Sequence, residues 1–298
     1  MITKTLLVTG SNGQLGKEMA ALSSLYTAYN FIFVTKEELP IDDTQAVEDF
    51  FKQYKIDFLV NCAAYTAVDK AEIETEKAYN INGYAVGNLA KICKKHQVSF
   101  IHISTDYVFD GTGIEPYQEN FAVNPANVYG ASKLKGEELA LQNNPETIII
   151  RTSWVYSSFG NNFVKTMLRL MGERESINVV ADQYGCPTYA ADLANAIMQI
   201  VNKIEQTDVV LQTALPFATI FNYSNKGEIN WHQFATAIKE LSGSNCIVNA
   251  IPSSQYPTPA KRPQYSVMDT NKIEQTFNIV IPEWKDSLKK CLHLISNK

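Results

Sequence analysis

Three glycines come directly after a short apolar run near the start of the chain, in TLLVTGSNGQLG at residues 5–16. Gly10 can adopt backbone angles that are closed to other residues, and Gly13 lets the main chain approach a pyrophosphate. Gly16 allows the following helix to pack closely on its strand, and the N-terminus of that helix favours bound phosphate. The pattern predicts a strand–turn–helix unit of a dinucleotide-binding fold. The expected cofactor contacts in this unit are Gly10, Asn12, Gly13, Gln14, Leu15 and Gly16.

Strand-like and helix-like segments alternate through the first half of the chain. Amphipathic segments such as 44–54 and 76–96 separate the apolar runs 31–35, 57–64, 98–105 and 147–156. Nearly continuous apolar strands between helices indicate an α/β fold of the Rossmann type, a doubly wound parallel sheet. Ligands bind such sheets at the carboxyl ends of the strands. Gly10, Ala63, Thr105 and Trp154 each follow one of the expected strands, so we expect the site there.

The length of 298 residues allows two domains. We expect an NADP-binding Rossmann domain at 1–155 together with about 189–225. A smaller C-terminal substrate-binding domain would comprise about 156–188 and 226–298, with a helix that begins near Trp231.

Two further segments have no place in that alternation. The proline-rich segment 251–263 is unsuited to regular structure, and we expect a loop folded over the substrate pocket or, alternatively, a linker. Residues 205–219 have the character of an insertion to which the sequence assigns no function.

Tyr129 and Lys133 lie four residues apart in VYGASKLKGEELA, so on a helix both side chains project from one face. A tyrosine hydroxyl normally titrates near ~10, and a nearby ammonium stabilises the phenolate and lowers that pKa. We therefore expect the proton-handling pair of a carbonyl reductase, in which Lys133 lowers the pKa of Tyr129. Thr105, beside Ser104, would hydrogen-bond the substrate carbonyl; the alternative is that Thr105 only caps a turn.

The glycine turn and the Tyr–Lys pair agree on one enzyme class. The spacing GxxGxxG together with YxxxK resembles the short-chain dehydrogenase/reductase superfamily. Sugar-nucleotide 4,6-dehydratases of that superfamily carry Thr-Asp-Glu where this chain has Thr105, Asp106 and Tyr107. Because Tyr107 replaces the base that drives elimination of water, the resemblance favours simple ketone reduction over dehydration.

The end of the second expected strand selects between the two nicotinamide cofactors. An acidic residue at this point binds the ribose diol of NADH, whereas this chain has Thr35 followed by Lys36. We expect NADPH, with NADH as an accepted alternative because Glu37 and Glu38 follow. Asp42 is expected either to accept from the adenine amino group or to cap a helix. Further cofactor contacts are expected from Ala63, Ala64, Tyr65 and Asn82.

Eight segments carry a more specific resemblance: TGSNGQLG, NCAAYTAVDKAE, STDYVFDG, NVYGASKLKGE, RTSWVY, GNNFVKTML, DQYGCPT and YPTPAKRP. Together they are similar to the dTDP-4-dehydrorhamnose reductase family, an extended branch of the superfamily. The resemblance implies that hydride from NADPH reduces the C4 ketone of dTDP-4-dehydro-β-L-rhamnose, the last step of dTDP-L-rhamnose biosynthesis. It also implies that Tyr129 donates the proton and that Lys133 holds the nicotinamide ribose. The implied substrate contacts are Ser104, Thr105, Tyr107, Trp154, Asn162 and Arg262.

Some positions depart from the family pattern. Pro40 stands where the family commonly has Asp, which weakens the expected contact on the adenine side. Arg262 suits nucleotide phosphates by its guanidinium fork, or is an uninvolved surface arginine. Some members dimerise through Mg²⁺ held by glutamates, but of those positions only Glu18 is acidic here, the others being Ala191 and Lys285. We therefore expect no bridging metal, and either a monomer or a homodimer.

Composition excludes several other classes of protein. A formal net charge of −5 without a Lys/Arg cluster gives no reason to expect nucleic acid. No apolar run reaches the ~18 residues that span a bilayer. Scattered cysteines without CxxC, and an N-terminus that enters a strand directly, favour a cytoplasmic protein. Two alternatives to the reductase remain: a non-catalytic NADP-binding regulatory subunit of the same fold, and another extended-type sugar-nucleotide epimerase or reductase.

Overall fold

A six-stranded, entirely parallel sheet forms the centre of the computed structural model, which describes residues 3–206 and 220–297. Its order is β2-β1-β3-β4-β5-β10, so the direction of winding reverses between β1 and β3. This arrangement confirms the predicted doubly wound α/β fold. The strands are β1 (Lys4–Thr9), β2 (Tyr29–Val34), β3 (Phe58–Asn61), β4 (Ser99–Thr105), β5 (Ile148–Thr152) and β10 (Ile220–Tyr223).

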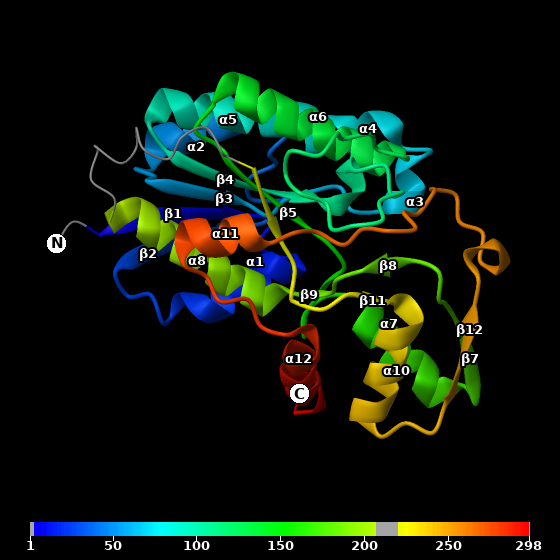
Figure 1. The fold of residues 1–298 in the computed structure, drawn as a ribbon. Helices are drawn as coiled ribbons and strands as arrows, with labels where there is room; N and C mark the ends of the chain where they lie inside the picture. Colours follow the sequence, from blue (N-terminus) through cyan, green and yellow to red (C-terminus); the bar gives the residue numbers. More distant parts are fainter. Residues whose placement is uncertain (1–2, 207–219, 298) are drawn as a thin grey trace.

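Helices cover both faces of the sheet (Figure 1). Alternate side chains of β1 serve the two layers: Leu6 and Val8 pack in the core of one face, and Leu7 packs in the core of the other. The first face is covered by α1 (Gln14–Ser23), α8 (Ala190–Gln206) and α11 (Asn271–Phe277). The second face is covered by α2 (Thr44–Gln53), α5 (Ala85–His96) and α6 (Val128–Asn143).

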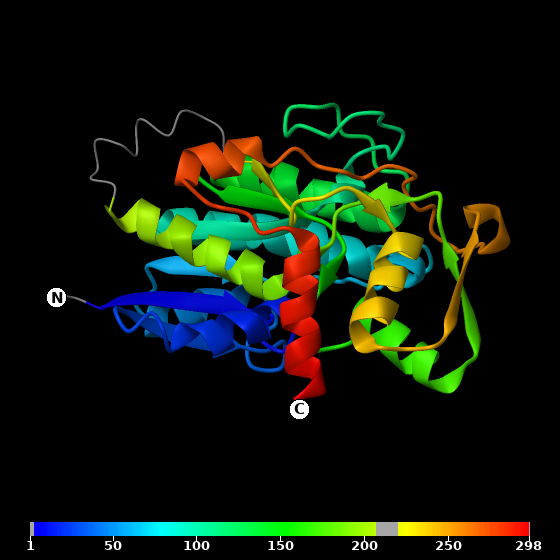
Figure 2. The same ribbon diagram turned by 60° about the horizontal axis from the view of Figure 1, so that its bottom comes forward.

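A second group of elements lies at one end of the sheet and has its own hydrophobic core (Figures 1 and 2). Its helices are α7 (Phe163–Glu173), α10 (Trp231–Ser242) and α12 (Trp284–Ser296). Its strands form short pairs: β6 (Val155–Tyr156) with β9 (Thr188–Tyr189), β7 (Ser176–Val180) with β12 (Ile247–Ile251), and β8 (Tyr184–Gly185) with β11 (Ile229–Asn230). The helix expected near Trp231 begins at that residue.

The packing of α11 differs from the expected division of the chain at residue 226. Ile273 and Phe277 of α11 lie in the core of the main sheet, together with Ile279 and Ile281. Sequence periodicity shows that a helix has an apolar face but not which core that face enters, so this return of the chain was not foreseen. The rest of the expected division stays a prediction. Most of the expected insertion at 205–219 lies outside the described residues.

The expected single helix over 76–96 is interrupted. It consists of α4 (Thr75–Tyr79), a π-helical turn at Asn80–Tyr84, and α5. The wide turn carries Asn82 into the interior, and α6 approaches it so closely that a Cβ on Gly136 would lie 2.1 Å from the Asn82 carbonyl oxygen. Such π turns occur frequently at functional sites.

No helix among residues 3–206 and 220–297 is both long and apolar enough to cross a membrane.

Candidate active site

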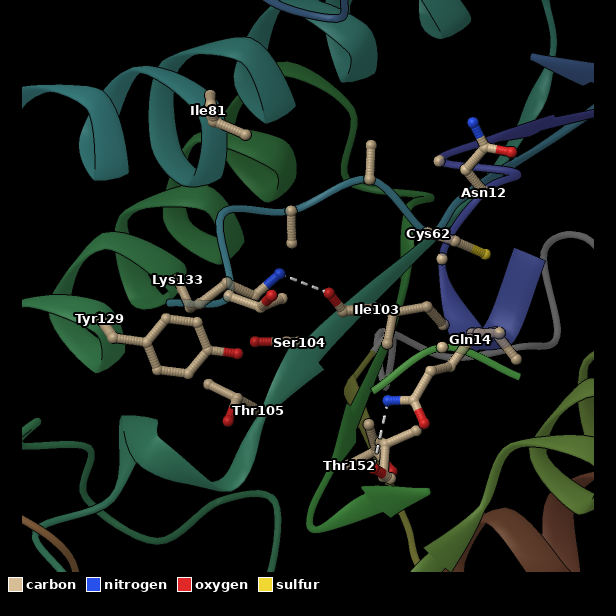
Figure 3. Close-up of a pocket in the computed structure, with 18 of the residues that line it drawn as sticks. Asn12, Gln14, Cys62, Ile81, Ile103, Ser104, Thr105, Tyr129, Lys133 and Thr152 are labelled. Carbon is tan, nitrogen blue, oxygen red and sulfur yellow. Dashed lines mark hydrogen bonds between the residues drawn. The ribbon is translucent and has the colours of Figure 1, made fainter. Parts of the chain in front are cut away.

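A cavity of about 740 Å³ lies at the carboxyl ends of the strands, where the winding of the sheet reverses (Figure 3). It extends from the glycine turn after β1, past the loops that follow β2 and β3, to the end of β4. There it reaches the face of α6 that carries Tyr129 and Lys133. Many of the predicted site residues line it: Gly10, Asn12, Gly13, Gln14, Leu15, Asp42, Ala63, Ala64, Ser104, Thr105, Tyr107, Tyr129, Lys133 and Trp154.

The glycine turn has the geometry that its sequence predicts. Gly10 has a φ of +66°, and a Cβ on it would lie 2.6 Å from the backbone nitrogen of Ala63. Gly13 precedes α1 and has no capping side chain, so the first amides of that helix face the cavity. Gly16 does not line the cavity; a Cβ there would lie 2.6 Å from the Gly10 carbonyl oxygen. Its contribution here is the close packing of helix and turn, and its role as a direct cofactor contact stays a prediction.

Thr35 does not line the cavity, and its role as a cofactor contact stays a prediction. Its backbone N–H donates to Glu38 Oε2 at 2.8 Å, and its hydroxyl accepts from the Glu38 N–H at 3.4 Å. Lys36 and Glu37 line the cavity in its place. Asp42 lines the cavity, and Asp43 rather than Asp42 caps α2, which removes the capping alternative for Asp42.

Tyr65 and Asn82 support the loop after β3 instead of lining the cavity. Asn82 accepts from the Tyr65 N–H at 2.8 Å and donates to the Tyr65 carbonyl at 3.0 Å, and it also donates to Ser132 Oγ. The ring of Tyr65 packs with Ala71 and Ala78. Both residues were predicted as cofactor contacts, but the π turn directs Asn82 to the loop backbone, which holds the lining residues 62–64 and 66.

Helix α6 presents Tyr129 and Lys133 to the cavity. The Asn127 side chain caps it by accepting from the Gly130 N–H at 2.8 Å. A Cβ on Gly130 would lie 2.1 Å from the Tyr107 carbonyl oxygen, so the start of the helix is pressed against the end of β4. Tyr129 therefore points towards Thr105, as Figure 3 shows.

Thr105 caps the turn after β4, and its contact with the substrate carbonyl stays a prediction. Its side chain lines the cavity beside the Tyr129 phenol (Figure 3). It also accepts from the Tyr107 N–H at 3.2 Å and donates to Asp106 Oδ1 at 3.0 Å, and so caps the turn after β4.

Lys133 does not act on Tyr129 as predicted. Its Nζ donates to the Ile103 carbonyl at 2.6 Å and lies 3.4 Å from His102 Nε2. Burial raises the pKa of Tyr129 above its ordinary value, against the lowering effect of the Thr105 hydrogen bond. Burial also lowers the pKa of Lys133 to about 8, although the charge of Glu137 raises it. The expected lowering of the tyrosine pKa was wrong, because desolvation is the largest cause of the shift and the charges of Asp106 and Tyr107 also raise this pKa. The phenol is therefore neutral at neutral pH.

Asp106 is a site residue to which the sequence assigned no role. It lines the cavity and is 3% exposed. Burial raises the pKa of its carboxyl to about 7, against the lowering effect of hydrogen bonds from Ser266 and Thr105. The signal was its place between two assigned residues, but the sequence does not show that the fold buries this carboxyl.

Ser104 lines the cavity, but its hydroxyl is already bonded. It donates to Glu137 Oε1 at 2.5 Å, and Glu137 is in turn held by Arg151, whose Nη2 lies 2.7 Å from Oε2. Both charged side chains are 3% exposed. The Ser104 hydroxyl therefore spends its one donor on the buried ion pair, and its contact with substrate stays a prediction.

Trp154 lines the cavity in an uncommon backbone conformation, with a φ of +47°. Its ring stacks on Trp231 with centroids 3.5 Å apart. A Cβ on Gly185 would lie 2.7 Å from the Trp154 ring, so the other side of the ring is also closely packed. A left-handed non-glycine residue beside a cavity is typical of functional sites.

Asn162 was predicted to contact substrate but lies behind the cavity wall. Its side chain caps α7 by accepting from the Lys165 N–H, and it donates to Gln14 Oε1 at 2.9 Å. The neighbouring Gly160 and Asn161 line the cavity. Asn162 therefore positions Gln14, and its contact with substrate stays a prediction.

Arg262 is engaged by protein groups. Its Nη1 donates to the Tyr107 hydroxyl at 3.1 Å, and its Nη2 lies 2.7 Å from Asp69 Oδ2. None of residues 251–263 lines the cavity, so the proline-rich segment reaches it only through Tyr107. Arg262 is thus paired with a carboxylate of the protein, and its contact with a phosphate stays a prediction.

Glu18, at the position of a family metal ligand, is 6% exposed and accepts from Ser157 Oγ at 2.5 Å. No group of three or more His, Cys, Asp or Glu side chains that could hold a metal ion occurs in the described parts of the chain.

Comparison with known proteins agrees with this geometry. Residues 4–297 match the family described as RmlD substrate binding domain. A dTDP-4-dehydrorhamnose reductase of Aggregatibacter actinomycetemcomitans is 40% identical over 95% of this chain and 97% of that protein. The crystal structure of a dTDP-4-dehydrorhamnose reductase from Clostridium acetobutylicum has a TM-score of 0.89 at 37% identity, covering 98% and 99% of the two chains. That of the Bacillus anthracis enzyme in complex with NADP has a TM-score of 0.88 at 35% identity, with the same coverage.

Proposed function

The chain belongs to the RmlD substrate-binding-domain family, and on that premise we propose that it reduces the C4 ketone of dTDP-4-dehydro-β-L-rhamnose with NADPH. The product would be dTDP-L-rhamnose. The curated relatives named dTDP-4-dehydrorhamnose reductase support this substrate, and the NADP complex of the Bacillus anthracis relative supports the cofactor.

The observation that carries the proposal is the meeting of two distant motifs in one cavity. Tyr129 and Thr105 line one end side by side, and the Gly10 turn with the first amides of α1 lies at the other. A purely NADP-binding regulatory subunit needs the second feature but not the first. The convergence therefore favours an enzyme.

The residues present fit a dinucleotide. At Gly10 the chain passes Ala63 too closely for a side chain, which leaves a path for a pyrophosphate along the first amides of α1. Lys133 would hold the nicotinamide ribose, and bound NADPH supplies the hydride. Lys36 lines the cavity where a 2′-phosphate would lie, while the Glu38 carboxylate is held by the Thr35 amide. This arrangement supports NADPH, with NADH as an accepted alternative because Glu37 also lines the cavity.

Tyr129 and Thr105 perform the acid chemistry in this proposal. Thr105 orients the carbonyl, and Tyr129 gives its phenolic proton to the oxygen that becomes an alkoxide. Because burial keeps the phenol neutral, the donor form is fully populated at neutral pH. Tyr107 in place of a carboxylate leaves no base for dehydration at that position.

The test is oxidation of NADPH by the purified protein with dTDP-4-dehydro-β-L-rhamnose, followed by identification of the reduced sugar. Other nucleotide ketosugars serve as controls for substrate identity. No oxidation, combined with stable co-purification with another enzyme, would instead support the regulatory subunit. We also propose a cytoplasmic location, and a monomer or homodimer in solution.

A further inference from the structure

Three polar side chains cross the buried sheet side by side. Thr9 of β1 is the register partner of Asn61 on β3, and Asn61 is the register partner of His102 on β4. All three are fully buried. Thr9 Oγ1 donates to Asn61 Oδ1 at 2.6 Å, Asn61 Nδ2 lies 3.1 Å from His102 Nδ1, and His102 Nε2 lies 3.4 Å from Lys133 Nζ. The row therefore runs from the strand of the glycine turn to the catalytic lysine.

The direction of the hydrogen bonds along this row is fixed at Asn61. The backbone N–H of Ala63 donates to Asn61 Oδ1 at 3.2 Å, and a backbone N–H is only a donor. The amide oxygen of Asn61 is therefore on the side of Ala63, and its NH₂ group faces the ring of His102. Since an amide NH₂ can only donate, His102 Nδ1 must accept.

The acceptor role of Nδ1 sets the tautomer of His102. Burial, and secondly the charge of Lys133, lower the pKa of this histidine well below its ordinary value, so the ring is neutral. A neutral imidazole has one N–H group, and because Nδ1 accepts a hydrogen bond, the N–H group is at Nε2. The Nε2–H group thus faces Lys133 Nζ.

An N–H group beside a lysine nitrogen disfavours the ammonium and stabilises the amine, whose lone pair can accept it. The Ile103 carbonyl accepts from the same nitrogen at 2.6 Å in either form. The other titratable groups near Lys133 are Cys62, at the end of β3, and Tyr129 and Glu137, each one turn away on α6. The charge of Glu137 is matched by Arg151, so it only partly restores the ammonium.

We propose that His102 is a positioning residue for Lys133: its Nε2–H donates to the amine and so allows this lysine to lose its proton within the working range of the enzyme. The equilibrium is balanced, since the ammonium releases one proton to solvent, retains an N–H to Ile103, and its freed lone pair accepts from His102. The predicted effect on the pH dependence of kcat rests on the proposed reductase activity. The assignment of the His102 tautomer does not depend on that activity.

The tautomer is tested directly by ¹⁵N NMR of the imidazoles. The chain has four histidines, and His102 is assigned as the signal lost in His102→Gln. We expect the Nε2–H tautomer, neutral across the range in which the protein is folded. An Nδ1–H tautomer, or a His102 that is protonated at neutral pH, would overturn the proposal whatever the enzyme reduces.

The effect on Lys133 is tested by the pH dependence of kcat. In His102→Gln the side-chain carbonyl can accept from the ammonium, so the alkaline limb should move up by roughly one pH unit. His96→Gln is the matched control, because His96 contacts Phe51 on α2, away from the site, and the limb should stay in place. An unmoved limb in His102→Gln, with native NADPH affinity, would contradict the role assigned to His102. If that variant does not fold, single Gln variants of His96, His232 and His293 assign the His102 signal by elimination, and the NMR result on the native protein still decides.

Discussion

The ring of Tyr107 meets the ring of Tyr129 edge-on, with centroids 5.5 Å apart and planes inclined by 78°. The Tyr107 hydroxyl accepts from Arg262, which also pairs with Asp69. Edge-to-face contact is a favoured arrangement of aromatic rings. The proton donor is therefore backed by a ring that a distant part of the chain holds in place.

Arg262→Met should release Tyr107 and loosen the placement of Tyr129. We expect kcat to fall by about tenfold, below the ~10² that a full ångström of misplacement can cost, with little change in NADPH affinity. Steady-state kinetics for both substrates provide the measurement. The control is Arg169→Met, whose guanidinium pairs with Glu173 on the surface of α7. A higher KM for the sugar nucleotide at unchanged kcat would instead show that Arg262 binds the phosphates of the substrate.

Tyr129→Phe should retain cofactor affinity and lower turnover by at least ~10², because only the proton donor is lost. Single-turnover kinetics and fluorescence titration with NADPH separate the two effects. Tyr54→Phe, an exposed tyrosine at the end of α2, is the control. Undiminished turnover in Tyr129→Phe would require a different proton donor.

Gly10→Ala combines a left-handed backbone with a collision against Ala63. The strain should lower the free energy of unfolding by about 1–3 kcal/mol and weaken NADPH binding. Gly172→Ala is a matched control in α7, where an added Cβ meets nothing within 4 Å, and it should stabilise by about 0.5–1 kcal/mol. Denaturant unfolding and NADPH titration measure both variants. Native NADPH affinity in Gly10→Ala would exclude a close approach of the pyrophosphate.

Asp106 should make stability depend on pH with a defined sign. Its pKa is raised to about 7, so between its ordinary pKa and that value the folded state holds more protons than the unfolded state. Stability from this group is therefore present at low pH and lost as pH rises. From about pH 4 to pH 8, the free energy of unfolding of Asp106→Asn should rise relative to that of the native protein by up to about 4 kcal/mol. Unfolding free energies of the two proteins across this range provide the comparison, and a constant difference would show that the carboxyl is ionised throughout.

The sequence predicts those parts of the molecule that local pattern controls. The apolar strands, the glycine turn and the i, i+4 placement of Tyr129 and Lys133 depend on backbone geometry that short segments specify. The π turn at Asn82 was missed, because its cause is the close approach of α6 to that turn.

The sequence could not show the protein partners of the polar residues near the cavity. Thr35, Asn162 and Arg262 each bond a protein group that a distant or neighbouring segment supplies, and a motif does not reveal such partners. The pKa of Tyr129 was mispredicted for a related reason. A motif shows which charge is adjacent but not how far both groups are removed from water, and here burial is the larger effect.

The contact of Gly136 with the Asn82 carbonyl has a consequence for how this enzyme can vary. A methyl group at that position would push α6, which carries Tyr129, away from the π turn at Asn82. The Tyr129 phenol would move with the helix. The position of the Tyr129 hydroxyl thus depends on the absence of a Cβ atom at Gly136, two helical turns further along α6. Residue 136 should therefore tolerate fewer replacements than many residues that line the cavity.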